Sequence, residues 1–138
     1  MEAVALHNKI LPTEDITAFV SNPASGGVVV FIGTVRNQTK EKTVRHLFFE
    51  AYEPMAITEM EKIVEYAKSN WRLESMAMHH RLGNVAIGEA AVVIACASAH
   101  RKAAFEACAY AIDTLKETVP IWKKEIFEDG AVWVSAHP

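Results

Sequence analysis

The stretch AAVVIACASAHRKAAFEACAYAIDTLKET, residues 90–118, decides the fold. Residues 90–97 are all apolar, which is typical of a strand buried on both faces. From about His100 to Thr118 the apolar residues recur at helical spacing, and their stripe consists of Ala104, Cys108, Ala111, Ile112 and Leu115. Val119-Pro120 ends this helix, because proline disfavours helical geometry in the residue before it. A buried strand therefore leads directly into an amphipathic helix.

On both sides of this unit, the sequence predicts further strands and helices. Helices are predicted from Thr13, which offers an N-cap, and from Pro54, whose stripe is Ala56, Met60, Ile63, Val64 and Ala67. Strands are predicted at Val4–Ile10, Val28–Ile32, Val44–Ala51 and Met76–Leu82, with a C-terminal hairpin of Ile121–Phe127 and Ala131–Ser135 around Asp129-Gly130. We expect an α+β fold with helices packed on a largely antiparallel sheet.

Two of these segments carry more specific expectations. Val28–Ile32 is apolar and β-branched on both faces, which favours a central, fully buried strand. Met76–Leu82 alternates as a half-buried strand does, and residues 36–43 are polar enough for an exposed loop.

Length, composition and charge bound the class of protein. The 138 residues suit a single domain, residues 1–138, and 51% hydrophobic with 22% charged residues excludes a disordered chain. The formal net charge of −3 argues against a nucleic-acid or membrane-surface binder. The longest apolar stretch, Ala90–Ala99, is far shorter than the ~20 residues of a membrane span. No signal peptide is recognisable, and two cysteines outside any C-x-x-C pair fit a reducing cytoplasm.

An anion site is predicted where the buried strand gives way to the helix, at Ser98-Ala99-His100-Arg101. The free N–H groups and the dipole of a helix start attract anions, and His100 and Arg101 add side-chain donors. The alternative is a Ser98 that merely caps the helix beside a solvated Arg101. Arg36, at the end of the strand that contains Val28–Ile32, opens a locally positive loop and is a second candidate.

Lysines around Pro120 form the third candidate cluster. Lys116 lies on the helix beside its apolar stripe, and strand alternation places Lys123 and Glu125 on one face and Lys124 on the other. A lysine near other cations loses its proton more easily and can act as a base or nucleophile. The alternative is a set of surface lysines beside a core tryptophan. The residues alone point to a phosphorylated small molecule and leave an enzyme, a binding module and a structural dimer all open.

Several chemistries are not supported by the sequence. No zinc-ligand spacing, P-loop, dinucleotide fingerprint or G-x-S-x-G elbow is present, so we predict neither a metal site nor a resident cofactor. His79 and His80 are adjacent in a strand, point to opposite faces and are interpreted as structural, and Cys96 and Cys108 as core thiols.

At these residues the sequence resembles the catalytic (large) subunits of molybdopterin synthase, from about Gly26 to Ala136. The resemblance rests on the order and spacing of several short stretches, FIGTVR at 31–36, EAY at 50–52, HRLG at 80–83, HRKAAF at 100–105, LK at 115–116 and PIWKKE at 120–125. It implies an α/β-hammerhead fold with an additional small antiparallel β-sheet.

The resemblance also implies an activity, partners and site residues. The reaction would move sulfur, twice, onto cyclic pyranopterin monophosphate from a small ubiquitin-like carrier with a C-terminal Gly-Gly thiocarboxylate. The chain would form a homodimer at the centre of a heterotetramer with two carriers. By position, Lys116 and Lys123 match catalytic lysines. The substrate-binding positions would be Thr34, Val35, Arg36, His100, Arg101, Lys124 and Glu125.

The sequence departs from the family pattern in two places. The family usually places a basic residue, typically an arginine contributed across the dimer, after the W-V strand, and here His137 follows Trp133-Val134-Ser135-Ala136. The stretch Asn37–Thr43 also lacks the glycine often found there, so its conformation is left open.

Overall fold

The computed structural model describes residues 1–135 and has the predicted α+β architecture, with nine strands and three helices in the described part. The helices are α1 (Thr13–Val20), α2 (Glu53–Trp71) and α3 (Arg101–Thr118). The strands are β1 (Val4–His7), β2 (Gly27–Thr34), β3 (Gln38–Thr39), β4 (Lys42–Ala51), β5 (Ser75–Arg81), β6 (Gly83–Ala86), β7 (Ala90–Ser98), β8 (Ile121–Phe127) and β9 (Gly130–Ser135). Among these residues no helix is long and apolar enough to cross a bilayer.

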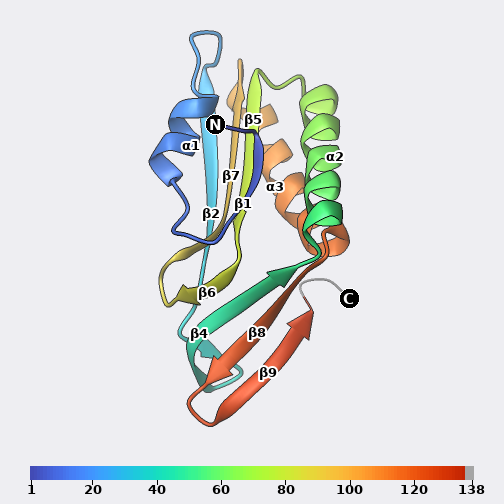
Figure 1. Cartoon of the computed structure of the whole chain (residues 1–138). Coiled ribbons are helices and arrows are strands. Elements are labelled where there is room, and N and C mark those ends of the chain that lie inside the picture. The colour runs from blue at the N-terminus through green and yellow to red at the C-terminus, as the bar shows by residue number, and fades with distance from the viewer. Residues whose placement is uncertain (136–138) are drawn as a thin grey trace.

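Two sheets build the molecule (Figure 1). The first has the order β1-β5-β7-β2 and is antiparallel except for the β1–β5 pair. Helix α1 covers one face of this sheet, and α2 and α3 cover the other. The second sheet is antiparallel in the order β3-β4-β8-β9, with β6 paired to β4, and extends beyond the helices. It is the additional antiparallel sheet that the family resemblance implied.

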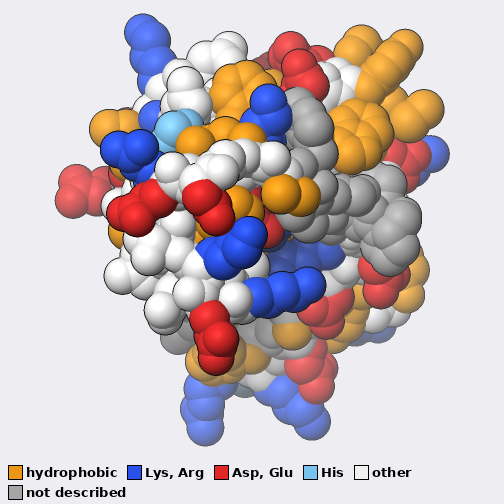
Figure 2. All heavy atoms as spheres, turned by 90° about the horizontal axis from the view of Figure 1, so that it is seen from below, with side chains coloured by type: hydrophobic (Ala, Val, Ile, Leu, Met, Phe, Trp, Pro, Cys, Tyr) orange, Lys and Arg blue, Asp and Glu red, His pale blue; other side chains and the backbone are white. Residues whose placement is uncertain are grey.

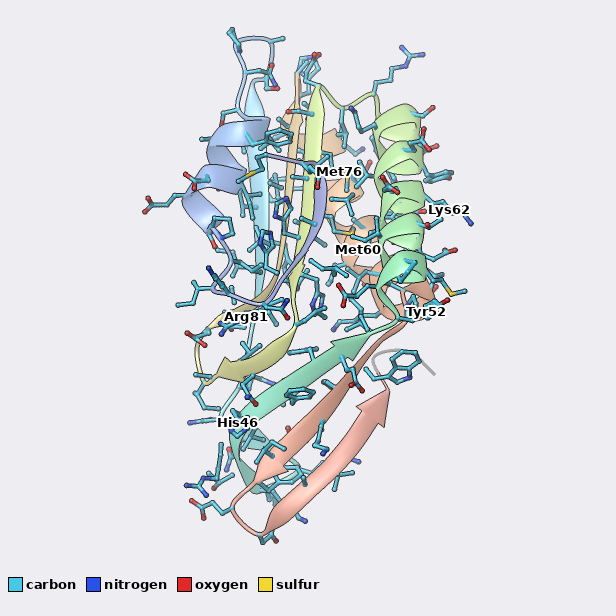
Figure 3. The ribbon with its side chains drawn as sticks, viewed as in Figure 1. His46, Tyr52, Met60, Lys62, Met76 and Arg81 are labelled. Atoms are coloured by element: carbon cyan, nitrogen blue, oxygen red, sulfur yellow. The ribbon has the colours of Figure 1, made fainter. Side chains whose placement is uncertain are left out.

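The core between the first sheet and α2 and α3 confirms the predicted helical stripes. All five α2 stripe residues are buried, and Met60 and Met76 point into the space between α2 and the sheet (Figure 3). On α3 the stripe is buried except for the half-buried Ile112. Cys96 and Cys108 are free thiols within this core, as predicted.

Three local expectations are wrong. Strand β2 lies at the edge of the first sheet, not at its centre, and Val28, Phe31 and Ile32 are 40%, 37% and 44% exposed. Strand β5 is buried on both faces from Met76 to His80 instead of being half-buried, because helices cover both sides of the sheet. The N-cap of α1 is Pro12, one residue before Thr13.

The segment expected to be a loop, residues 36–43, contains a tight hairpin. Gln38 pairs with Thr43 and Thr39 with Lys42, which leaves Lys40 and Glu41 as a two-residue connection. Both have positive φ, 49° and 70°, a combination that two-residue hairpins require and that favours asparagine and glycine. The chain therefore places two L-residues in a left-handed conformation where the family often has a glycine.

We expect Glu41→Gly to stabilise the protein. Left-handed backbone costs a non-glycine residue roughly 1–2 kcal/mol, so the free energy of unfolding should rise by about 1 kcal/mol. The measurement is urea unfolding followed by circular dichroism. Thr43→Gly is the matched control, because Thr43 lies in a regular strand and glycine there should lower stability. A Glu41→Gly protein no more stable than wild type would contradict the positive φ.

Candidate active site

A pocket of about 250 Å³ lies where the second sheet meets α3 and the end of β2. Its walls are largely apolar side chains from both sheets and from α3, with four polar groups among them. The lining residues are Phe31, Gly33, Thr34, Leu47, Phe49, His80, Ala91, Val92, Ile112, Leu115, Lys116 and Lys123. An apolar pocket with a few converging polar groups is the usual form of a small-molecule site.

The two predicted catalytic lysines reach this pocket from different elements. Lys116 lies in the last turn of α3, next to the buried Leu115. The helix ends at Thr118, and the buried Val119 and Ile121 turn the chain back into β8. Lys123 follows two residues later on β8, directly across from Phe49 of β4. The proline-containing turn thus returns the chain to the pocket and brings Lys123 to the same cavity as Lys116.

The end of β2 supplies the pocket's third side. A register shift between Gly33 and Thr34 marks an irregularity in the ladder with β7, and Thr34 lines the pocket. Val35 is buried and fixed on both sides, because its N–H donates to the Glu89 carbonyl (3.2 Å) and its carbonyl accepts from Gly88 N–H (2.9 Å). Arg36 follows it and is exposed. Val35 and Arg36 therefore flank the pocket without lining it.

The predicted alternation along β8 is confirmed. The pairing places Lys123 and Glu125 on the face that carries Phe49 and Leu47 toward the pocket, and Lys124 on the opposite face. Glu125 is only 7% exposed, beside the pocket on the side of Lys123. Lys124 is half-buried and has an interaction partner. Lys124 and Glu125, the last two residues of the PIWKKE stretch, thus lie on opposite faces of β8.

The start of α3, where the sequence predicts an anion site, has no side-chain cap. His100 is the N-cap in extended conformation, both His100 and Arg101 are exposed, and no side chain caps the first turn. Ser98 does not act as the cap, since its hydroxyl donates to the His100 carbonyl at 2.5 Å. The first N–H groups of α3 consequently have no side-chain partner from Ser98, which favours the anion-site interpretation over the capping one.

A glycine pair lets β2 pass close to this helix start. A Cβ on Gly26 would lie 2.4 Å from the Ala99 carbonyl oxygen, and one on Gly27 would lie 3.1 Å from the Arg101 Cα. Any larger residue would push the start of α3 away from the sheet. Because Gly26 and Gly27 have no side chains, the backbone at Arg101 can pack directly against the sheet.

Within one chain the anion site and the lysine pocket are not brought together. Arg101 begins α3 and Lys116 lies in its last turn, and at 1.5 Å per residue their Cα atoms are about 22 Å apart along the axis. Of the candidate residues, Thr34, Lys116 and Lys123 are the ones that the structure brings to one pocket. His100 and Arg101 belong to the opposite end of the helix.

Sequence reasoning missed His80 as a pocket residue. The prediction that His79 and His80 face opposite sides is confirmed, since His79 stacks on His7 of β1 at 4.9 Å between ring centroids and His80 lines the lysine pocket. Burial lowers the pKa of His80 to about 4, partly offset by its hydrogen bond to the Arg81 carbonyl. The one sequence feature that could have indicated His80 as a pocket residue is its place in the HRLG stretch that carries the resemblance.

Other parts of the described surface fit the proposed anions less well. A hollow of about 550 Å³ between the start of the chain and α2 is lined by Glu2, Glu61 and Glu65 against Lys62. Seen from the end that bears the second sheet, Lys and Arg side chains gather near the middle with carboxylates around them (Figure 2).

Within residues 1–135 no three His, Cys, Asp or Glu side chains form a metal-binding group. His137 lies outside the described residues.

Known proteins are similar to this chain in sequence and fold. The family model of the MoaE protein matches residues 6–118. The molybdopterin synthase catalytic subunit of Bacillus subtilis (strain 168) is 47% identical over 134 residues, which cover 97% of this chain and 85% of that protein. The human catalytic subunit is 46% identical, and the match covers 89% of this chain and 65% of the human protein.

Solved structures agree with these matches. The crystal structure of molybdopterin synthase from Staphylococcus aureus superposes with a TM-score of 0.93 at 41% identity, covering 97% of this chain and 98% of that one. A complex of subunits 1 and 2 of the molybdopterin-converting factor from Helicobacter pylori 26695 superposes with a TM-score of 0.78 at 26% identity, covering 99% and 94%.

The two-sheet α+β fold and these matches define the catalytic subunit of an enzyme. The chain belongs to the MoaE family, that of the molybdopterin synthase catalytic subunits of molybdenum cofactor biosynthesis.

Proposed function

We propose that this chain transfers sulfur from the C-terminal Gly-Gly thiocarboxylate of a small ubiquitin-like carrier onto cyclic pyranopterin monophosphate. Two such transfers give the dithiolene of molybdopterin. The observation that carries the proposal is the convergence of Lys116 and Lys123, from α3 and β8, on one largely apolar pocket. Membership of the family supports it, and so does the two-subunit complex of the Helicobacter pylori relative.

The chemistry of the pocket suits an acyl transfer. The thiocarboxylate sulfur bonds to a side-ring carbon of the substrate while a carbon–oxygen bond at that carbon breaks and the leaving oxygen takes a proton. Water then cleaves the acyl–sulfur bond, leaving sulfur on the substrate and a carboxylate on the carrier. When water adds to the acyl carbon, negative charge develops on the acyl oxygen. A lysine ammonium aimed at that oxygen stabilises the charge. A lysine can also give or take the proton that moves when the substrate ring opens. No resident cofactor or metal takes part in this scheme.

The pocket's shape and walls suit the carrier's tail. A Gly-Gly terminus is the thinnest polypeptide available, and an opening of about 250 Å³ bounded by Phe31, Leu47 and Phe49 admits such a chain without side chains. Thr34 lines this pocket, and Val35, Arg36 and Glu125 beside it are further proposed binding positions. Lys124, on the opposite face of β8, would contact the substrate or the carrier only from outside this pocket.

We place the substrate's phosphate at His100 and Arg101, because the uncapped start of α3 and the arginine fork suit its oxygens. Since about 22 Å separates this group from Lys116 in one chain, we propose that the phosphate is held by the partner protomer of a homodimer. Two carriers would then complete a heterotetramer. The free buried thiols fit the reducing cytoplasm in which we place the reaction.

An exposed apolar strip supports this dimer. It follows the edge strand β2 and is 37–59% exposed. Phe31 faces α3 and lines a common hollow with Phe105, whereas Val28 and Ile32 lie on the α1 side of the same edge. Exposed apolar area of this kind is usually covered by a partner. A two-fold axis through the strip would run the two α3 helices antiparallel, so that each Arg101 approaches the other protomer's Lys116.

The proposed function is tested by reconstitution from purified components. The chain, the thiocarboxylated carrier and cyclic pyranopterin monophosphate should yield molybdopterin with one carrier carboxylate formed per sulfur transferred, as measured by fluorescence of the oxidised pterin and mass spectrometry of the carrier. The carrier with an ordinary carboxylate terminus is the control and should give no product. Binding of the thiocarboxylated carrier without product would instead identify a non-catalytic binding module.

A further inference from the structure

His80 lines the lysine pocket. It lies on β5, is 4% exposed, and packs edge-on against Phe49 with 5.0 Å between ring centroids. Its Nδ1 lies 2.8 Å from the Arg81 carbonyl oxygen. A carbonyl oxygen can only accept, so Nδ1 carries the proton. In the neutral ring, which burial favours, Nε2 is then a bare acceptor.

The rest of the pocket lacks such a group. Lys116 and Lys123 offer only donors, and most of the other lining residues offer apolar carbon. Among the described lining side chains, His80 Nε2 and the Thr34 hydroxyl are the available acceptors. No hydrogen-bond partner of Nε2 occurs within residues 1–135. Nε2 is therefore left to accept a hydrogen bond from a molecule that enters the pocket.

We propose that His80 is a substrate-binding residue whose Nε2 accepts a hydrogen bond from a ring N–H of the heterocycle bound beside Lys116 and Lys123. This inference rests on the proposed function, since a pterin is a fused heterocycle that carries such N–H groups. The lysines donate to the substrate's oxygens, whereas His80 accepts a hydrogen bond from an N–H group of its heterocycle. The fixed tautomer makes this recognition directional, because the Arg81 carbonyl holds the ring with Nδ1 turned away from the ligand.

A purely structural role is the competing explanation. Arg81 pairs with Glu89 at 2.9 Å and donates to the Asn84 carbonyl, so the β5–β6 corner is tightly bonded. The hydrogen bond from His80 to the Arg81 carbonyl could serve that corner alone. The two roles use different ring nitrogens, and two amide substitutions separate them.

His80→Asn keeps a donor near the Nδ1 position and removes the acceptor at Nε2, whereas His80→Gln can place an amide oxygen near Nε2 and gives up the bond to Arg81. Binding of cyclic pyranopterin monophosphate is measured by calorimetry on the complex with the carrier, together with the melting temperature. We expect about tenfold weaker binding for His80→Asn at near wild-type melting temperature. His80→Gln should stay within about threefold of wild-type affinity and melt lower.

The matched control is His79→Asn on the same strand. His79 faces α1, hydrogen-bonds to His7 and to the Glu2 carbonyl, and should affect melting without changing pterin affinity. Wild-type affinity in His80→Asn, with weakened binding only in His80→Gln, would overturn the inference in favour of the structural role. A wild-type complex that binds no pterin would overturn the proposed function as well, so the two failures are distinguishable.

Discussion

Replacing Lys116 by alanine should reduce molybdopterin formation at least about a hundredfold, because removal of one oxyanion donor typically costs 10²–10³ in kcat. Lys116 is placed at the pocket by the last turn of α3, with Leu115 buried beside it and the side chain itself exposed. Its other contribution, a positive charge at a helix C-terminus, is worth at most about 1 kcal/mol. The variant should therefore fold, and the measurement is single-turnover product formation from thiocarboxylated carrier.

Two comparisons make this result specific. Lys116→Gln keeps the length of the side chain without its charge and should be as inactive as the alanine variant. Lys62→Ala is the matched control, since Lys62 lies on the exposed face of α2 in a surface pair with Glu59 at 3.1 Å and should leave turnover unchanged. Wild-type turnover in Lys116→Ala with normal carrier binding would remove the lysine from the chemistry.

The helices of this fold were predictable because their stripes depend on local spacing alone. Met60 and Ala67 lie on one face of α2 at any position in the molecule, and both are buried. The position of β2 was not predictable, because burial of Val28 and Ile32 depends on which strands lie beside them. Their apolar character indicated a central strand, whereas among residues 1–135 β2 pairs with β7 alone and forms an edge.

The site was predictable residue by residue but not as an assembly. Alternation along β8 placed Lys123 and Glu125 on one face, and the register with β4 confirms it. The length of α3 was predicted correctly, and this length alone places Arg101 and Lys116 at opposite ends of the helix. His80 was missed because its contact with the pocket depends on the second sheet packing below β5.

Two inactive proteins should restore each other's activity if the site is shared across a dimer. Arg101→Ala should weaken phosphate binding, so that turnover at low substrate concentration falls, while Lys116→Ala removes the chemistry. In a heterodimer of the two variants, one site combines both defects, and the other combines the intact Lys116 of one protomer with the intact Arg101 of the other. Heterodimers isolated through two different affinity tags should then show about half of the wild-type turnover at low substrate, since one of two symmetric sites is whole.

The arrangement of α3 makes this outcome diagnostic. If each chain held a complete site, every protomer of the heterodimer would carry one defect and activity would stay near that of the parent variants. About 22 Å between the ends of α3 opposes that arrangement, and the apolar strip between them offers the surface along which a second copy would run. Phe105→Glu places a charge in this strip and should shift the protein toward monomers and abolish complementation, whereas Glu106→Gln, its exposed neighbour on α3, should do neither. Recovery by the tagged heterodimer and its loss with Phe105→Glu would together assign the phosphate and the lysines of each site to different protomers.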